Sequence, residues 1–224
     1  EEARRIAFKL DIPHYVMNFR EVFQKNVIDY FVSEYQKGRT PNPCIACNRY
    51  VKWEALLQNS KKIGADFIAT GHYAEIVKHP KTQRYTLKCR DENKKDQTYV
   101  LYNLTQEQLQ YTLMPIGGSQ KEVIRKIAEQ IDINISKKPD SQEICFIPDN
   151  DYSGFIQRET TKTYPAGNFV DLDGNVLGKH KGIIYYTVGQ RKGLGIAFGK
   201  PMDVYSIDAE KMMLYFKKRF MQII

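Results

Sequence analysis

Helical patterns that end at glycine alternate with short apolar runs in the first part of the chain. Glu21 to Lys37 carries apolar residues at helical spacing and is followed by Gly38. A second helical pattern runs from about Arg49 to Ile63, before Gly64, and a short buried-type run follows at Asp66 to Thr70. Because helices that alternate with strands are typical of parallel sheets, the sequence predicts an α/β fold with a parallel sheet.

Other segments extend this prediction. We expect a helix over residues 3–10, a short strand over His14–Phe19, and two helices over Gln106–Leu113 and Lys121–Ile131. Residues Glu75–Leu104 interrupt the alternation with a hairpin-like excursion. After Asp149, short strands and glycine-rich turns dominate, which predicts a small and mostly β domain. The expected domains are residues 1–149 and 150–224.

Composition limits the kind of protein. A hydrophobic fraction of 42% in 224 residues is enough for a core, and no run of eighteen apolar residues predicts a membrane span. Four cysteines without dense spacing fit a reducing cytosol better than a secreted disulfide scaffold, so we expect a cytoplasmic protein. The net charge of +8, with lysines and arginines among aromatic residues, fits a nucleic-acid partner and equally a merely basic protein.

Two cysteines lie three residues apart in a segment rich in proline and asparagine. Cys44 and Cys47 follow Pro41 and Pro43, which predicts a rigid surface turn with Cys47 near the N-terminus of the next helix. Such a pair can be a redox couple or half of a metal site, or its spacing can be accidental. Cys89, in a strand-like run, is expected to be packed.

Two polar motifs follow. Ala69–Tyr73 ends the predicted strand, where ligands of α/β proteins bind; Gly71 allows close approach, and His72 can hydrogen-bond or take up a proton near neutral pH. A capping glycine beside a packed histidine is the alternative. Lys94–Gln97 offers two cations, an acceptor and an amide that suits a base edge, or else a solvated loop.

Five blocks, taken in order, resemble the tRNA-specific 2-thiouridylases. They are GRTPNPxxxCN, ATGHY, KDQTY, KKPDSxxICFI and YTVGQRKGLGI, at residues 38–48, 69–73, 95–99, 137–147 and 186–196. The resemblance extends from Glu1 to about residue 215. It implies a partial adenine-nucleotide α-hydrolase domain, of the ATP-pyrophosphatase type, followed by the family's central β-rich domain.

The resemblance also implies a reaction and its cysteines. The family uses ATP to activate the 2-position oxygen of the wobble uridine of tRNA, and then replaces it with sulfur to give 2-thiouridine. Cys145 matches the cysteine that carries the persulfide, and Cys47 matches the nucleophilic partner that helps to release sulfur, within disulfide reach. A sulfur donor protein, either a cysteine desulfurase or a relay, is the implied partner.

Binding residues follow from the same resemblance. Gly71 matches an ATP-contacting glycine, and Mg²⁺ is expected with the ATP. The residues that match tRNA contacts are Asn42, Pro43 and Cys44 at the target base, and His72, Lys95, Asp96 and Gln97 elsewhere.

The chain departs from the family pattern in three respects. The phosphate loop SGGVDS would precede Glu1 and the C-terminal β-barrel would follow Ile224, so we expect an inactive fragment, or alternatively a non-catalytic tRNA-binding module. Many members have aspartate where this chain has Cys44. Cys44, Cys47 and Cys145 together suit an iron–sulfur cluster, as the alternative to a metal-free persulfide mechanism.

Overall fold

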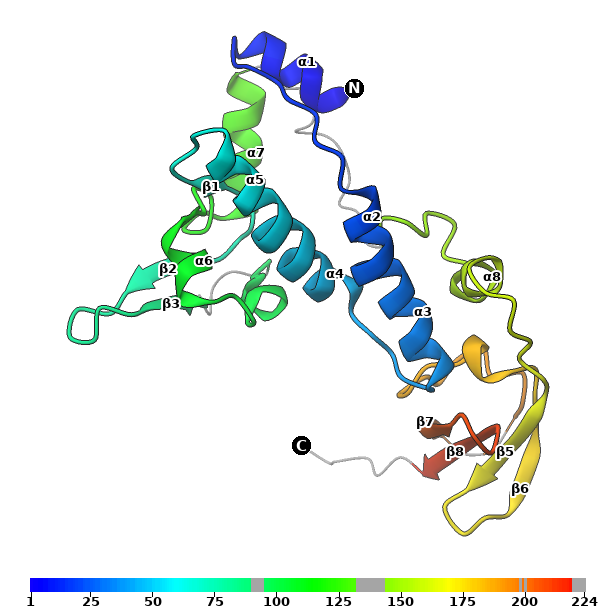
Figure 1. Cartoon of the computed structure of the whole chain (residues 1–224). Helices are drawn as coiled ribbons and strands as arrows, with labels where there is room; N and C mark the ends of the chain where they lie inside the picture. The colour runs from blue at the N-terminus through cyan, green and yellow to red at the C-terminus, as the bar shows by residue number, and fades with distance from the viewer. Residues whose placement is uncertain (90–94, 132–143, 198, 200, 219–224) are drawn as a thin grey trace. The chain divides into compact units, whose positions relative to one another are not determined.

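The computed structural model describes residues 1–89, 95–131, 144–197, 199 and 201–218 (Figure 1). Packing divides the chain into two units. Unit 1 contains residues Glu1–Asn26 and Cys44–Ser141, and unit 2 contains Val27–Pro43 and Gln142–Ile224. Each unit therefore draws on two stretches of the chain. The domain boundary after residue 149 stays a prediction.

Unit 1 is built on a long helical run and two small sheets (Figure 1). Its helical elements are α1 (Glu2–Lys9), α2 (Arg20–Phe23), α4 (Pro43–Ala46), η2 (Cys47–Leu56), α5 (Leu57–Lys62), η3 (Thr98–Leu101), α6 (Gln106–Gln110) and α7 (Lys121–Gln130). Strand β1 (Ile68–Ala69) pairs in parallel with β4 (Thr112–Leu113), and β2 (Glu75–Lys78) forms an antiparallel hairpin with β3 (Tyr85–Lys88). The parallel pair and the hairpin agree with the α/β prediction.

The core of unit 1 forms where the helical run covers the strands. Trp53 and Leu57 of that run are buried with Ile68 of β1, Ala74 and Leu101. Trp53 and Leu57 are four residues apart and therefore lie on one face of the helical run. The removal of all these apolar side chains from water stabilises the contact between helix and sheet.

Unit 2 contains a four-stranded sheet packed against helices. The strand order is β6 (Val176–His180), β5 (Gly167–Asp171), β8 (Met213–Lys218) and β7 (Met202–Asp208). Strands β5 and β8 are parallel, and the outer pairs are antiparallel. The helical elements around it are η1 (Gln24–Ile28, which begins in unit 1), α3 (Asp29–Gln36), α8 (Tyr152–Arg158) and η5 (Ile183–Tyr185). This sheet confirms the prediction of a second, β-rich part.

Alternation on the strands of unit 2 creates its core. Leu214 and Phe216 of β8 are buried, as are Phe169 of β5 and Val204 of β7. The rings of Phe169 and Phe216 meet edge to face, with centroids 5.1 Å apart. Residues two apart on a strand share one face, so a single register places all four side chains in the same layer.

Two predicted elements differ from the structure. His14–Phe19 is extended chain and not a strand; Tyr15 and Val16 are 74% and 77% exposed, so the segment has no buried face to hold a register. The predicted helix Gln106–Leu113 ends at Gln110, because Thr112 and Leu113 pair with β1. Within the described residues, no helix is long and apolar enough to span a membrane.

Candidate functional site

The cysteine pair lies in a helix and not in the turn that the prolines predict. The helix begins at Pro43, whose fixed φ and missing N–H suit the first helical position. Cys44 is exposed and Cys47 is half-buried in the next element, η2. Residues three apart are neighbours on a helix surface, so the two thiols share one side of this helix.

The helix start also changes which cysteine faces the dipole. The partial positive charge of a helix N-terminus acts mainly within the first turn. Cys44 lies in that turn, whereas Cys47 lies one residue beyond α4. The structure therefore corrects the expectation that Cys47 is the cysteine at the helix N-terminus.

Asn48 joins this helix to η3. Its side chain is only 2% exposed, and its Nδ2 donates a hydrogen bond to the carbonyl oxygen of Val100 at 3.0 Å. A buried amide is costly unless it is paired, so this bond fixes how η2 lies against η3. Asn48 was not among the predicted site residues, although it ends the block GRTPNPxxxCN.

His72 follows strand β1 and is buried against Trp53. The imidazole is 8% exposed, and its Nδ1 lies 2.9 Å from the hydroxyl oxygen of Thr70. Burial lowers the pKa of His72 from 6.5 to about 4, and the ammonium group of Lys52 acts in the same direction. His72 is therefore neutral at pH 7, which corrects the expectation that it takes up a proton near neutral pH.

Trp53 is held in place by a chain of buried hydrogen bonds. Its indole N–H donates to the hydroxyl of Thr112 at 2.7 Å, and that hydroxyl donates to the carbonyl of Gln108 at 2.6 Å. The side chain of Gln108 returns a bond to the carbonyl of Trp53 at 3.3 Å. This network links η2, β4 and α6, and it sets the position of the ring that covers His72.

The segment Lys95–Gln97 lies directly beside His72. The backbone N–H of Tyr73 donates to Oε1 of Gln97, and the N–H of Gln97 donates to the carbonyl of Tyr73, both at 3.0 Å. Asp96 accepts bonds from the N–H and hydroxyl of Thr98, at 3.0 and 2.5 Å, which is a local side-chain turn at the start of η3. Lys95 is exposed. The structure thus places Asp96 and Gln97 close to His72, as expected for residues that contact the same ligand.

Packing within the protein does not require glycine at position 71. It is exposed, and a Cβ at this position would meet Ile116 at an ordinary contact distance of 3.8 Å. Gly117 is the contrast, because a Cβ there would collide with the carbonyl oxygen of Ala74. The backbone at Gly71 is therefore open to approach from outside the protein.

Asn42, Pro43 and Cys145 belong to unit 2. Pro43 begins α4 and directly precedes Cys44, whereas the place of Cys145 beside Cys47 stays a prediction. Cys145 is exposed on a loop that is anchored by its neighbour Phe146, whose ring meets Phe31 edge to face at 5.6 Å. Ile147 is fully buried after it. The loop thus presents the thiol of Cys145 outward from an apolar anchor.

All four cysteines lie in the described residues, and each is present as a thiol. The disulfide that the resemblance implies is therefore not formed in this structure. Cys89 is exposed after β3, which corrects the expectation that it is packed. Within the described part of the chain, no three histidine, cysteine or acidic side chains gather closely enough to hold a metal ion.

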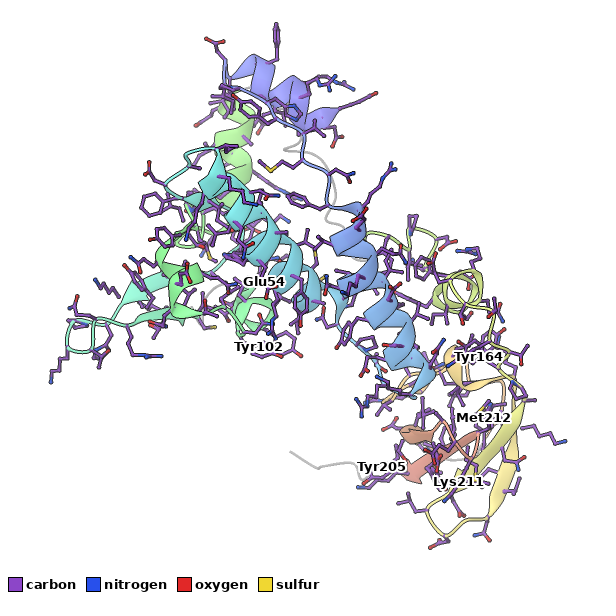
Figure 2. The ribbon with its side chains drawn as sticks, in the orientation of Figure 1. Glu54, Tyr102, Tyr164, Tyr205, Lys211 and Met212 are labelled. Carbon is purple, nitrogen blue, oxygen red and sulfur yellow. The ribbon has the colours of Figure 1, made fainter. Side chains whose placement is uncertain are left out.

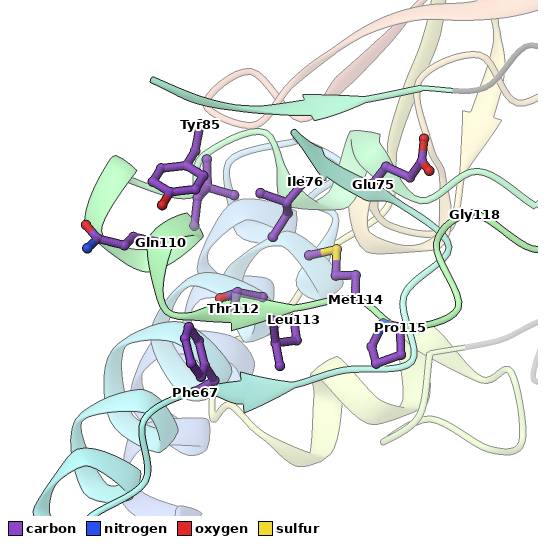
Figure 3. A pocket seen from close by; sticks show the side chains of 11 residues that line it. Phe67, Glu75, Ile76, Tyr85, Gln110, Thr112, Leu113, Met114, Pro115 and Gly118 are labelled. Atoms are coloured by element: carbon purple, nitrogen blue, oxygen red, sulfur yellow. The ribbon is translucent and has the colours of Figure 1, made fainter. Parts of the chain in front are cut away.

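A pocket of about 540 Å³ opens beside the parallel strands of unit 1 (Figure 3). Its lining comes from β2, β3 and β4 and from residues next to the strands, and includes Phe67, Ile76, Leu113, Met114 and Pro115. Neither Gly71 nor His72 lines it. The pocket is thus separate from the residues predicted to contact ATP and tRNA.

Comparison with known proteins adds two family models. One, described as the tRNA methyl transferase HUP domain, matches residues 1–149, and one described as the tRNA methyl transferase PRC-barrel domain matches residues 153–217. These descriptions say methyl transferase, whereas the similar curated proteins carry a different activity in their names.

Three such relatives are each named tRNA-specific 2-thiouridylase MnmA. The protein of Clostridium acetobutylicum is 59% identical over 94% of this chain and 59% of its own length. Those of Lachnoclostridium phytofermentans and Clostridioides difficile are 62% and 57% identical, over 94% and 93% of this chain and 58% of their own lengths. The chain therefore spans somewhat more than half the length of the curated relatives that it matches.

Proposed function

Because the chain belongs to the family of tRNA-specific 2-thiouridylases, we propose that it takes part in the ATP-dependent 2-thiolation of tRNA. The observation that carries this proposal is the grouping of family-pattern residues in unit 1. Asn48 joins the Cys47 helix to η3, and Gln97 joins the start of η3 to the residue after His72. Segments far apart in the sequence are thus joined by hydrogen bonds within unit 1.

We propose that residues 1–149 form the catalytic α/β domain and that residues 150–224 form a central domain. The substrate is a tRNA with a wobble uridine, and ATP with Mg²⁺ is the cosubstrate. Open backbone at Gly71 supports contact with the nucleotide, since only glycine leaves that approach unhindered. The net charge of +8 supports binding of a polyanion.

The chemistry that we propose uses two thiols in sequence. The 2-position oxygen of the uridine first attacks the α-phosphate of ATP, which forms the adenylate and releases pyrophosphate. The terminal sulfur of a Cys145 persulfide then attacks C2, and AMP leaves with the oxygen. The Cys47 thiolate next attacks the Cys145 sulfur, which breaks the S–S bond, leaves sulfur on the base and joins the two cysteines in a transient disulfide. Two external thiols reduce that disulfide by successive exchange and are themselves joined in a disulfide, which a reducing cytoplasm permits.

His72 and Lys95–Gln97 have different proposed roles in holding tRNA. A neutral imidazole offers a hydrogen bond without charge, whereas Lys95 offers an ammonium group to a phosphate. The carbonyl end of Gln97 is used by Tyr73, so we assign its NH₂ end to the RNA. Asn42, Pro43 and Cys44 are the proposed contacts of the target base.

The persulfide comes from a donor protein, either a cysteine desulfurase or a relay. The alternative is thiolation that depends on an iron–sulfur cluster bound by Cys44, Cys47 and Cys145. We favour the metal-free route, because the family pattern matches Cys47 and Cys145 directly and Cys44 only by proximity. The cluster would need its third thiolate from unit 2.

Thiolation of tRNA tests this proposal. The protein that carries this sequence is given ATP, tRNA and a desulfurase with cysteine, and 2-thiouridine is measured on a mercury-affinity gel. We expect Cys145→Ser and Cys47→Ser to abolish the product while tRNA binding persists. Cys89→Ser is the control, because Cys89 is also exposed but lies outside the family pattern. Product from the Cys145→Ser variant would remove the persulfide role.

A further inference from the structure

Two exposed tyrosines lie side by side, one on η3 and one on the residue that directly follows it. Tyr99 and Tyr102 are 68% and 67% exposed, and their ring centroids lie 6.3 Å apart with planes inclined by 37°. In a 3₁₀-helix, side chains three apart lie one above the other, so the short helix itself aligns the two rings. Figure 2 labels Tyr102 in this part of unit 1.

The rings border a pocket of about 440 Å³ between η3 and strand β3. Its other residues include Tyr85 and Leu87 of β3 and Leu104 and Leu109 near α6. The ammonium group of Lys78 lies 5.4 Å from the centre of the Tyr85 ring. The pocket is therefore aromatic on its rim and apolar beneath, with a cation at one side.

Both walls of this pocket are held by buried or backbone hydrogen bonds. On the η3 side, Asn48 bonds to Val100, and Leu101 is fully buried. On the β3 side, the side chain of Gln106 accepts from the N–H of Tyr85 and donates to its carbonyl, both at 2.8 Å. A planar ligand would thus meet two rings carried on a fixed backbone, which lowers the ordering entropy lost on binding.

The charge around the pocket favours a nucleic acid. Lys78, Lys88 and Lys95 are exposed on β2, on β3 and just before η3. Ammonium groups attract phosphates, and tyrosine rings stack on unpaired bases. A protein ligand would equally cover the rings, but these lysines add nothing specific for it.

We propose that Tyr99 and Tyr102 form a stacking subsite for an unpaired base of the bound tRNA, other than the base that is thiolated. The proposal rests on the proposed function, and it adds base stacking to the tRNA contacts that the resemblance implies for Lys95, Asp96 and Gln97. Stacking is tolerant of sequence, so the subsite recognises a single-stranded conformation and not a particular base.

RNA binding tests the subsite with the chain as it stands. The affinity of a labelled stem-loop RNA with an unpaired loop is compared with that of a fully paired RNA of equal length. Loss of one stacked base corresponds to about fivefold weaker binding or more, so we expect Tyr99→Ala and Tyr102→Ala to weaken loop binding by that factor. Binding of the paired RNA stays unchanged.

Two controls separate stacking from other effects. Tyr99→Phe and Tyr102→Phe keep the rings and should bind the loop as the unaltered chain does. Tyr15→Ala removes another exposed tyrosine of unit 1 and should have no effect. Because stacking releases no counterions, the salt dependence of binding should keep its slope in the alanine variants.

The subsite is refuted if the alanine variants bind the loop RNA normally, or if they lose the paired RNA equally; a protein ligand would then explain the rings. It is also refuted if the phenylalanine variants lose as much as the alanine variants. If the unaltered chain binds neither RNA, the tRNA function itself fails, and the subsite fails with it. Circular dichroism confirms that each variant is folded.

Discussion

The imidazole of His72 packs against the indole of Trp53, with ring centroids 5.5 Å apart and planes inclined by 47°. Trp53 lies in the same helix, η2, as Cys47, whereas His72 follows strand β1. This contact makes the state of the imidazole depend on the helix that carries a proposed catalytic thiol. It also explains the neutral charge of His72, because the ring removes water from it.

Substitution of Trp53 tests this dependence. Trp53→Phe keeps an aromatic ring but removes the bond to Thr112, which we expect to lower the free energy of unfolding by about 1–3 kcal/mol. Trp53→Ala should cost about 3–5 kcal/mol. It should also raise the pKa of His72 from about 4 toward 6.5, because the imidazole regains water. Urea unfolding and an NMR titration of the imidazole measure these effects; an unchanged titration in Trp53→Ala would contradict them.

The stability of the protein should fall in mild acid. In unit 2, Nε2 of His180 donates to the carbonyl of Met212 at 3.0 Å, while Nδ1 accepts from the N–H of Gly182 at 3.1 Å, so the ring is neutral. Burial lowers the pKa of His180 below 6.5, although the Met212 carbonyl opposes this shift. In the unfolded chain the imidazole of His180 takes up a proton at about pH 6.5, whereas in the folded protein it does so only at lower pH. The contribution of His180 to the free energy of unfolding is therefore complete above about pH 6.5 and declines as the pH falls below it.

Thermal unfolding between about pH 7.5 and pH 4.5 checks this direction. His180→Gln removes the contribution of one histidine and should flatten part of the decline. His14→Gln, at an exposed position, serves as the control and should leave the decline unchanged. A stability that rises on acidification through this range would show that the sign is wrong.

Substitution of two glycines in unit 1 by alanine should change the free energy of unfolding by very different amounts. Gly71→Ala adds a methyl group that meets only Ile116 at 3.8 Å, so we expect a change in unfolding free energy of at most about 0.5 kcal/mol. Gly117→Ala forces a collision with the carbonyl of Ala74 and should cost several times more, about 2 kcal/mol or above. We expect ATP binding to weaken in Gly71→Ala although the stability of that variant is normal. Normal ATP affinity in that variant would exclude close backbone contact with the nucleotide.

tRNA binding should depend steeply on salt, and single lysines should change its slope. Lys95→Ala is expected to weaken binding and reduce the slope of log affinity against log salt by about 1. Arg191 should contribute less, because its guanidinium lies 2.9 Å from a carboxylate oxygen of Asp203. Lys126→Ala, on the exposed part of α7, is the matched control. A filter-binding titration with a flat salt dependence would argue against phosphate contacts altogether.

Sequence patterns located the elements whose signals are local. The helical stripe of Glu21–Lys37 ends as predicted, since Gly38 has a φ of +73° and a Cβ there would press on Ile207 at 2.8 Å. The pairing of Thr112 with Ile68 was not predictable in the same way, because a strand of two residues depends on a partner far away in the sequence. The expected strand at His14 failed for the same reason.

In the candidate site, too, the features with a local sequence signal were predicted and those that depend on distant residues were not. The glycine and histidine after a strand marked Gly71 and His72, but the protonation state of His72 depends on burial by Trp53, which no local pattern contains. Asn48 was missed because an asparagine inside a helix is ordinarily exposed, and only the carbonyl of Val100 gives it a buried role. Prolines before Cys44 indicated a turn, whereas Pro43 instead begins the helix.

Cys44 separates the persulfide route from the cluster route. Cys44 and Cys47 share a helix side, which suits two ligands of one cluster or one thiol beside a target base. In the metal-free route Cys44 takes no part in sulfur transfer, so Cys44→Ser should thiolate tRNA at close to the normal rate. Anaerobic reconstitution with iron and sulfide, followed by iron analysis and visible absorption, should leave the active protein colourless. A visible band that Cys44→Ser abolishes together with thiolation would establish the cluster, because a serine hydroxyl cannot replace a thiolate ligand there.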